Sequence, residues 1–257
     1  MLYELWCDKE STGENLKQLW RLTERAGGRA AIVEDLSDCI RSHYDDMERI
    51  AEDIRELGYP QAAAILAERM PRSTRARSGE LGEILATELL EEQTGYTVPV
   101  RRLRYKDGRE MALRGDDFIG IRVDAEGHLH FLKGESKSRV ALAKATITEA
   151  RTALSKDGGR PTATSLLFVA DRLMDHADER QALGRKIRTE VVTRAPPAGR
   201  VGHVLFTMSG NATPQALHED LQAADAVRPH LAVHLRIEDH QAFIETCYER
   251  ALALGND

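Results

Sequence analysis

Residues 131–137 of the chain read Phe131-Leu132-Lys133-Gly134-Glu135-Ser136-Lys137. This stretch predicts a β-strand, in which side chains two positions apart share a face, roughly 6.5–7 Å apart. Glu135 and Lys137 are therefore expected to project together. A carboxylate suits a hard cation, and a lysine beside it can hold a water or offset charge on a phosphate. Alone, the pair is weak evidence, because such pairs are usually exposed and contribute ~0–1 kcal/mol.

Two further acids stand one predicted hairpin earlier, in Gly115-Asp116-Asp117-Phe118-Ile119-Gly120. Strands are predicted over residues 115–123 and 128–137, with a hairpin turn between them. Adjacent antiparallel strands lie about 4.8 Å apart, so an acid on one strand can share a cation with Glu135 on the other. Side chains alternate faces, so only one of Asp116 and Asp117 can do so, and the sequence leaves both open. Without the Glu135 pair, we would interpret both aspartates as capping or turning the chain.

A helix predicted over residues 79–93 carries a third candidate acid. Its apolar stripe consists of Leu81, Ile84, Leu85 and Leu89. Glu80 and Glu83 lie away from the centre of this stripe, and Gly82 would let the helix approach a sheet closely. The alternative is that both acids only interact with the helix dipole, a contribution of about 0.3–1 kcal/mol. We favour Glu83 as the site residue and keep Glu80 as its competitor.

The remaining sequence predicts an α/β fold. Residues 14–70 are predicted to be helical, and the basic stretch 71–78 is a predicted connector. Further strands are predicted over residues 97–105, 165–170, 201–208 and 231–237, and further helices over residues 140–154, 179–190 and 239–254. We therefore predict an N-terminal helical region at residues 1–75 and a second domain, a mixed sheet flanked by helices, at residues 76–257.

The bulk composition restricts the class of protein. The 257 residues are 42% hydrophobic and 30% charged, enough for one substantial core without disulfides. The three cysteines, at positions 7, 39 and 247, form no disulfide or zinc pattern, which indicates a reducing compartment. No apolar run approaches the ~18–20 residues needed to cross a bilayer, and the start lacks a signal-peptide pattern. We expect a cytoplasmic protein without membrane contact.

The formal net charge of -6 argues against tight nucleic-acid binding by the chain as a whole. Any DNA contact must therefore come from local basic patches. Two such patches flank the motifs, and from them we select five candidate DNA-binding residues: Arg72, Arg75, Arg101, Arg102 and Arg104. About half of such runs are only solvated surface charge.

Taken together, these motifs resemble the restriction-endonuclease-like PD-(D/E)xK superfamily: a helix acid, a strand acid, and Glu-x-Lys on the next strand. More specifically, residues 79–137 resemble the nuclease subunits of the Hachiman anti-phage system, the HamA family, and their relatives in the Abp defence system. The literal Pro-Asp pair is missing, because Gly115-Asp116 or Asp116-Asp117 stands in its place. The resemblance therefore leaves the choice between the two aspartates open.

The resemblance implies a DNase subunit restrained until infection and encoded with a superfamily 2 helicase partner. It also implies that Asp117 or Asp116, Glu135 and the Ser136 carbonyl hold Mg²⁺, with Mn²⁺ as the alternative cation. Lys137 would position a water or stabilise negative charge, and Glu83 would complete the site. The main alternative is a non-catalytic, nuclease-like adaptor that docks a helicase or DNA. Binding of divalent cations would separate the two.

Overall fold

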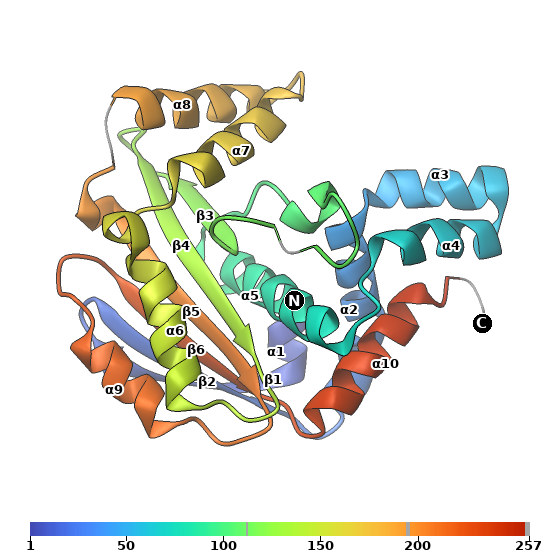
Figure 1. The fold of residues 1–257 in the computed structure, drawn as a ribbon, viewed down its shortest axis with the longest axis horizontal. Helices are drawn as coiled ribbons and strands as arrows, with labels where there is room; N and C mark the ends of the chain where they lie inside the picture. Colours follow the sequence, from blue (N-terminus) through green and yellow to red (C-terminus); the bar gives the residue numbers. More distant parts are fainter. Residues whose placement is uncertain (112, 194–195, 255–257) are drawn as a thin grey trace.

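The computed structural model describes residues 1–111, 113–193 and 196–254. Its centre is a six-stranded mixed sheet in the order β1-β2-β6-β5-β4-β3 (Figure 1). The strands are β1 (Cys7–Glu14), β2 (Lys17–Glu24), β3 (Phe118–Val123), β4 (Leu129–Ser138), β5 (Val201–Ser209) and β6 (His230–Arg236). The predicted α/β class, a mixed sheet flanked by helices compatible with a restriction-endonuclease-like core, is confirmed.

The strands combine two local hairpins with a parallel centre. β3 pairs antiparallel with β4, and β1 pairs antiparallel with β2, as expected for strands joined by short turns. β4, β5, β6 and β2 run parallel to one another. The predicted hairpin between residues 115–123 and 128–137 is therefore confirmed. The carboxyl end of β4, which carries Glu135 and Lys137, extends past the last pair with β3, Phe118 with Gly134.

Helices cover both faces of this sheet (Figure 1). α6 (Lys144–Ser155) and α9 (Gln215–Ala223) pack on one face, against apolar side chains of β2, β5 and β6. The other face carries a larger core built from α1 (Leu2–Trp6), α2 (Gly28–Tyr44), α4 (Tyr59–Arg69), α5 (Thr74–Thr94) and α10 (His240–Leu252). Leu81, Ile84 and Leu85 of α5 are fully buried there, so the predicted apolar stripe is confirmed. Gly95 ends α5 in the left-handed conformation.

Two helical hairpins extend from this body. α3 (Met47–Leu57) lies beside α4 at one side, and α7 (Ala163–Met174) packs with α8 (Glu179–Thr193) at the other (Figure 1). α7 and α8 share a separate apolar cluster with β3 and the start of β4. None of the helices in the described ranges combines the length and the apolar character needed to cross a bilayer.

Three secondary-structure predictions are wrong. The start of the predicted helical region, residues 14–24, belongs to β1 and β2. The prediction failed because a strand that is covered on both faces buries consecutive residues, here Leu19 and Trp20, and this pattern resembles helical spacing. Residues 165–170 lie in helix α7, whose N-cap Thr162 accepts a hydrogen bond from the Ser165 backbone. Residues 97–105 hold one bridge, Thr97 with Ile121, followed by a 3₁₀ helix. The proposed boundary at residues 75/76 stays a prediction, although the sheet takes strands from both sides of it.

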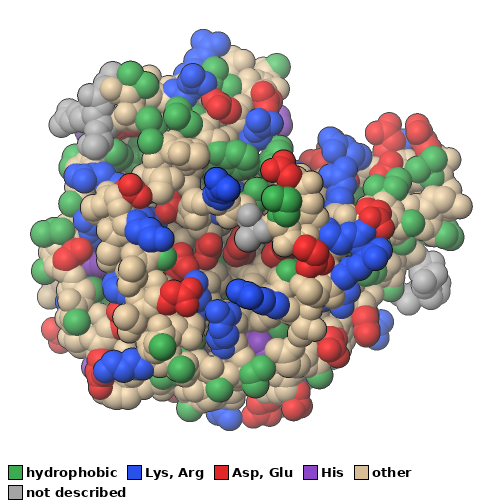
Figure 2. Space-filling view, in the orientation of Figure 1, with side chains coloured by type: hydrophobic (Ala, Val, Ile, Leu, Met, Phe, Trp, Pro, Cys, Tyr) green, Lys and Arg blue, Asp and Glu red, His purple; other side chains and the backbone are tan. Residues whose placement is uncertain are grey.

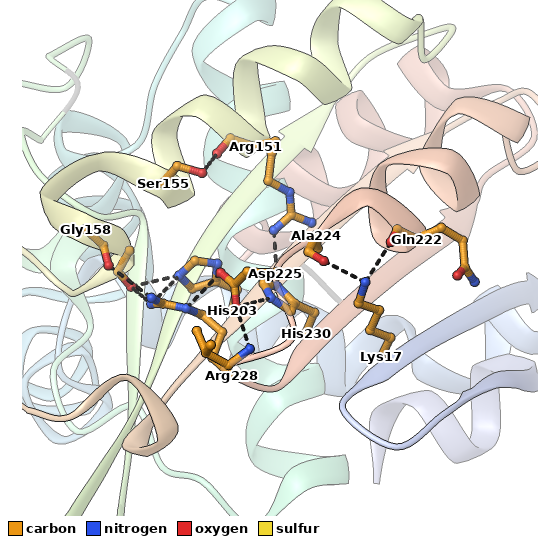
Figure 3. A network of polar contacts seen from close by, with 12 residues as sticks. Lys17, Arg151, Ser155, Gly158, His203, Gln222, Ala224, Asp225, Arg228 and His230 are labelled. Carbon is orange, nitrogen blue, oxygen red and sulfur yellow. Dashed lines mark hydrogen bonds and ion pairs between the residues drawn. The ribbon is translucent and has the colours of Figure 1, made fainter.

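A polar network joins the amino ends of β5 and β6 to the loop after α6 (Figure 3). Buried His203 lies 2.8 Å from the Gly159 carbonyl through Nε2, and buried Arg228 donates to the Gly158 and Gly159 carbonyls. His230 packs edge-on against His203. This network anchors the loop at the end of the sheet opposite to the carboxyl end of β4.

Candidate metal centre

The carboxyl end of β4 places Glu135 and Lys137 on the face covered by α6. Lys137 Nζ lies 2.6 Å from Glu135 Oε1 and 3.3 Å from an oxygen of Glu149 on α6. Glu135 is buried, so its carboxylate has lost most of its hydration. The predicted side-by-side arrangement is present, and Glu149 is an additional acid that the sequence motif did not include.

Asp117 directly precedes β3, and its side chain lies beside the part of β4 that extends past β3. Its Oδ2 accepts a 2.8 Å hydrogen bond from the Ser136 backbone N–H. In an antiparallel strand the N–H and C=O of one residue point toward the same neighbour, so the Ser136 carbonyl faces this edge as well. A carboxylate and a backbone carbonyl thus meet where the β3–β4 ladder ends.

Asp116 points elsewhere. Its carboxylate lies 3.4 Å from Nζ of buried Lys133 and accepts a 2.9 Å hydrogen bond from the Thr162 backbone at the start of α7. Both side chains of this ion pair are almost fully buried, at 4% and 3% exposure. The two aspartates that the sequence left as alternatives therefore have different neighbours, and Asp117 is the one beside Ser136.

The two helix acids also separate. Glu80 is buried and accepts a 2.6 Å hydrogen bond from the Tyr44 hydroxyl, and it pairs with Lys106. Glu83, one turn later, lines a small cavity together with Asp117. Gly82 makes this approach feasible, because a methyl group at that position would lie 2.7 Å from Ser136 Oγ. The predicted close approach of the helix to the sheet is confirmed.

The electrostatics of Glu83, Asp117 and Glu135 are those of a site that a cation would stabilise. Burial, followed by the charge of Asp117, raises the pKa of Glu83 well above its ordinary value. Burial raises the pKa of Asp117, although the Ser136 N–H lowers it in part. Burial and then Asp117 raise the pKa of Glu135 to about 7, against the opposing effect of Lys137. A divalent cation would relieve both the desolvation and the mutual repulsion.

The donor set is that of a hard cation. Carboxylates and a backbone carbonyl are the ligands that Mg²⁺ and Mn²⁺ prefer. His43 lines the same cavity as Glu83 and Asp117, but its Nε2 lies 2.9 Å from a Glu88 oxygen. The candidate ligands Glu83, Asp117, Glu135 and Ser136 come from α5, the loop before β3, and β4. Lys137 already binds Glu135, so a bound cation and Lys137 would share the Glu135 carboxylate.

Within the described residues, two other triplets bring three ligand atoms within 4.8 Å of one another: Cys39/His43/Glu88 and Asp124/Glu126/His128. The candidate carboxylates are less compact than these. In the first triplet, however, Glu88 is already bound by Arg101 at 3.1 Å and by His43 at 2.9 Å. The second triplet lies mostly exposed on the β3–β4 turn. Neither has the surroundings of a reactive centre.

Acidic side chains are visible at the bottom of a hollow between β4 and α5, with lysines and arginines near its rim (Figure 2). Of the predicted DNA-binding residues, Arg72 and Arg75 are exposed near the start of α5. Arg101 is bound by Glu91 at 2.6 Å, and Arg104 donates to the Ser42 carbonyl at 2.7 Å. Arg102 binds backbone carbonyls in the loop that carries Asp117. Their role on DNA stays a prediction.

Lys133 and Arg102 hold the loop before β3 in place, a role that the sequence motifs did not assign to them. Lys133 precedes Glu135 by two positions, so strand alternation alone places it on the same face. Its partner Asp116 and the carbonyls bound by Arg102 belong to a loop without periodicity, and no sequence signal pairs them.

Comparison with known proteins gives two matches. A family model described as HamA matches residues 1–251. A curated relative, the Hachiman protein HamA of Bacillus cereus, is 25% identical over 181 residues. That match covers 70% of this chain and 63% of the relative, so the chain spans less than two thirds of the relative's length. The family match includes every strand of the sheet and every candidate site residue.

Proposed function

Because this chain belongs to the HamA family, we propose that it is the metal-dependent DNase subunit of a Hachiman anti-phage defence complex. The observation that carries the proposal is the position of Asp117 at the edge where β3 leaves β4. It accepts a 2.8 Å hydrogen bond from Ser136 N–H, burial and then its charge raise the pKa of both Glu83 and Glu135, and Lys137 lies 2.6 Å from Glu135. Such a group of repelling carboxylates is costly for the fold and is typical of sites that hold a cation for phosphodiester hydrolysis.

Asp117, Glu135 and the Ser136 carbonyl would hold Mg²⁺, with Mn²⁺ as the alternative. When bound, the cation would supply Lewis-acid activation of the phosphate and of a water. The Ser136 N–H binds and orients the Asp117 carboxylate, and Glu83 forms part of the wall of the adjacent cavity.

Lys137 acts as a cation in this proposal. Burial lowers the pKa of its ammonium group, but the hydrogen bond and charge of Glu135, together with the charges of Asp117 and Glu149, leave the pKa above its ordinary value. A lysine with a raised pKa is a poor proton acceptor at neutral pH. Its role is therefore to orient a water and to stabilise negative charge that develops on the phosphate.

The central experiment compares two double variants in a plasmid-cleavage assay with Mg²⁺. Glu135→Ala with Lys137→Ala removes the acid and base of the proposed centre. Glu190→Ala with Arg200→Ala removes an equally buried ion pair, 3.0 Å long, at the opposite end of β4. We expect both proteins to fold and only the first to lose cleavage. Mg²⁺-dependent cleavage retained by the first would refute the proposal.

Metal binding separates this proposal from the adaptor alternative. We expect Mg²⁺ or Mn²⁺ to raise the unfolding temperature of the parent chain and not that of the Glu135/Lys137 variant, since only a ligand of the folded state stabilises it. An adaptor without turnover would show neither effect.

We further propose that the subunit works with a superfamily 2 helicase that holds the DNA and restrains cleavage until infection. The net charge of -6 supports this division of labour, because the chain has little overall attraction for a polyanion. Co-purification with the protein encoded beside it, followed by cleavage assays with and without ATP, tests the partnership. Cleavage by the purified complex that is as fast as cleavage by the chain alone, with and without ATP, would contradict the restraint.

A further inference from the structure

A cleft lined by arginines opens between the two helical hairpins. Figure 1 shows α7 and α8 on one side and α3 and α4 on the other, and Figure 2 shows a notch between them with basic side chains on both walls. The 3₁₀ helix η1 (Arg102–Tyr105) lies at its floor. Six arginines from five segments of the chain line the cleft: Arg49, Arg69, Arg101, Arg104, Arg172 and Arg180.

Each arginine of the cleft has a carboxylate partner, and several of these acids lie outside the lining. Only Asp45 and Asp46 accompany the six arginines among the lining residues in the described part of the chain. Asp45 is shared by Arg49 at 3.3 Å and Arg69 at 3.1 Å. Asp46 pairs with Arg104 at 3.3 Å, Glu91 with Arg101 at 2.6 Å, Asp175 with Arg172 at 3.3 Å and Asp178 with Arg180 at 2.5 Å. These ion pairs orient the guanidinium groups, and the side chains of Arg49, Arg172 and Arg180 stay 60%, 39% and 49% exposed, which leaves them accessible to a phosphate. Arginine forks match phosphate oxygens in two-point contacts better than lysines do.

An aromatic platform lies among these arginines. Tyr105 is 37% exposed and contacts Phe168 of α7 edge to face, with ring centres 5.6 Å apart. The guanidinium of Arg172 lies 5.2 Å from the centre of the Tyr105 ring. An exposed ring beside guanidinium groups is the arrangement on which bases of a single strand stack, whereas a base-paired duplex offers no free base faces.

The cleft also borders the candidate metal centre. Val98, Val100 and Arg101 line both the cleft and the small cavity that contains Glu83 and Asp117. The segment that contains these three residues therefore has the arginines of the cleft on one side and Glu83 and Asp117 on the other.

From these observations we propose that the cleft binds a single strand of nucleic acid, with phosphates on the arginines and a base stacked on Tyr105. This inference rests on the proposed nuclease function and adds that a single strand is the form the protein recognises. An acidic protein segment could contact the arginines but would leave the platform unused, and it would have no reason to border a centre for phosphodiester chemistry.

Two arginines of α8 give a matched test. Arg180 and Arg188 have side chains 49% exposed, and each pairs with one aspartate, at 2.5 Å to Asp178 and 2.6 Å to Asp171. Only Arg180 is among the residues that line the cleft. The probe is a fluorescent oligothymidine of about 16 nucleotides, measured by anisotropy in EDTA so that no cleavage occurs.

We expect Arg180→Glu to weaken binding about tenfold, or ~1.4 kcal/mol. The slope of log K against log salt should fall by about 0.7 for the lost phosphate contact. Arg188→Glu should leave both quantities near those of the parent. Equal effects of the two substitutions would overturn the proposal, because they would show only a general charge effect.

The aromatic platform is tested by Tyr105→Ala against Tyr105→Phe. We expect the alanine variant to lose about fivefold or more in affinity and the phenylalanine variant to keep it, since stacking needs only the ring. A duplex of equal length bound as tightly as the single strand would overturn the proposal, and so would displacement of the oligonucleotide by polyglutamate at equal charge. The anisotropy assay measures binding in EDTA, so its result does not depend on whether the Glu135/Lys137 variant cleaves plasmid. The two proposals can therefore fail independently of each other.

Discussion

The Arg102 guanidinium donates to the backbone carbonyl of Asp117, with Nη1 2.9 Å from the oxygen. The same side chain reaches the Asp116 carbonyl and, at 2.7 Å through Nη2, the Arg114 carbonyl. One guanidinium thus fixes the loop that delivers Asp117 to the edge of β4. This contact gives Arg102 a positioning role in addition to the DNA-binding role predicted from the sequence.

Arg102→Lys separates these two roles. A lysine keeps the charge but cannot form the planar set of contacts, so we expect the free energy of unfolding to fall by about 2 kcal/mol. Cleavage should show a kcat about tenfold lower, with KM within about twofold of the parent. Chemical denaturation and cleavage kinetics measure both. A raised KM with unchanged kcat would instead assign Arg102 to the DNA.

Asp116→Asn should reduce the stability of the fold, whereas Asp117→Asn should reduce metal binding. The first leaves buried Lys133 without its carboxylate, and we expect a loss of about 3–5 kcal/mol in unfolding free energy. Replacing Lys133 by Met in the same chain should restore part of that loss. The second removes a carboxylate whose pKa burial has raised, so stability in EDTA should be kept while the Mg²⁺-dependent rise in unfolding temperature disappears. Loss of that rise only in the Asp116 variant would exchange the two roles.

Two glycines on α5 test the close approach of this helix to β4. At Gly82 a methyl group would meet Ser136 Oγ, whereas at exposed Gly79 it would meet nothing within 4 Å. Gly79→Ala should therefore stabilise the chain by about 0.5–1 kcal/mol, the usual gain within a helix. Gly82→Ala should lose this gain and lower kcat at least about tenfold, because Glu83 is pushed away from Asp117. Equal kinetics for the two variants would show that the spacing is not important.

Acid pH should destabilise the fold partly through His203. Burial, together with Arg228 and His230, lowers the pKa of this histidine to about 4, although the Gly159 carbonyl opposes the shift. The unfolded chain takes up the proton near pH 6.5 and the folded chain only near pH 4. The contribution of His203 to stability is therefore fully present above pH 6.5. As the pH drops to 4, the free energy of unfolding falls by about 3 kcal/mol through this group. His203→Gln should flatten this part of the curve in denaturation measured from pH 7 to 4, and an unchanged slope would contradict the assignment.

Much of the fold was predictable because hydrophobic periodicity is local. The helix after Pro71, the β3–β4 hairpin and the strands at residues 201–209 and 230–236 all follow from such patterns. Leu19 and Trp20 were misread since both faces of β2 are covered, which removes the alternation that identifies a strand. Residues 165–170 are apolar and short, and only the cap at Thr162 distinguishes them as helical.

The candidate site was predictable in its residue types and less so in its choices. The spacing of Glu135 and Lys137 fixes their common face in any strand. The separation of Asp116 from Asp117 depends on Lys133 and α7, and that of Glu80 from Glu83 depends on Tyr44 and Lys106. These partners are distant in the sequence, so no local pattern contains them.

The pairing of β2 with β6 has a consequence for how the protein is made. Lys17 is aligned with His230, so segments near the two ends of the sequence lie side by side within the sheet. During synthesis on the ribosome, β2 can pair only with β1 until β6 (His230–Arg236) has emerged. Sheets closed by such distant segments fold slowly and leave strand edges open to wrong partners in the meantime. Newly made chains should therefore depend on chaperones more than their size alone suggests.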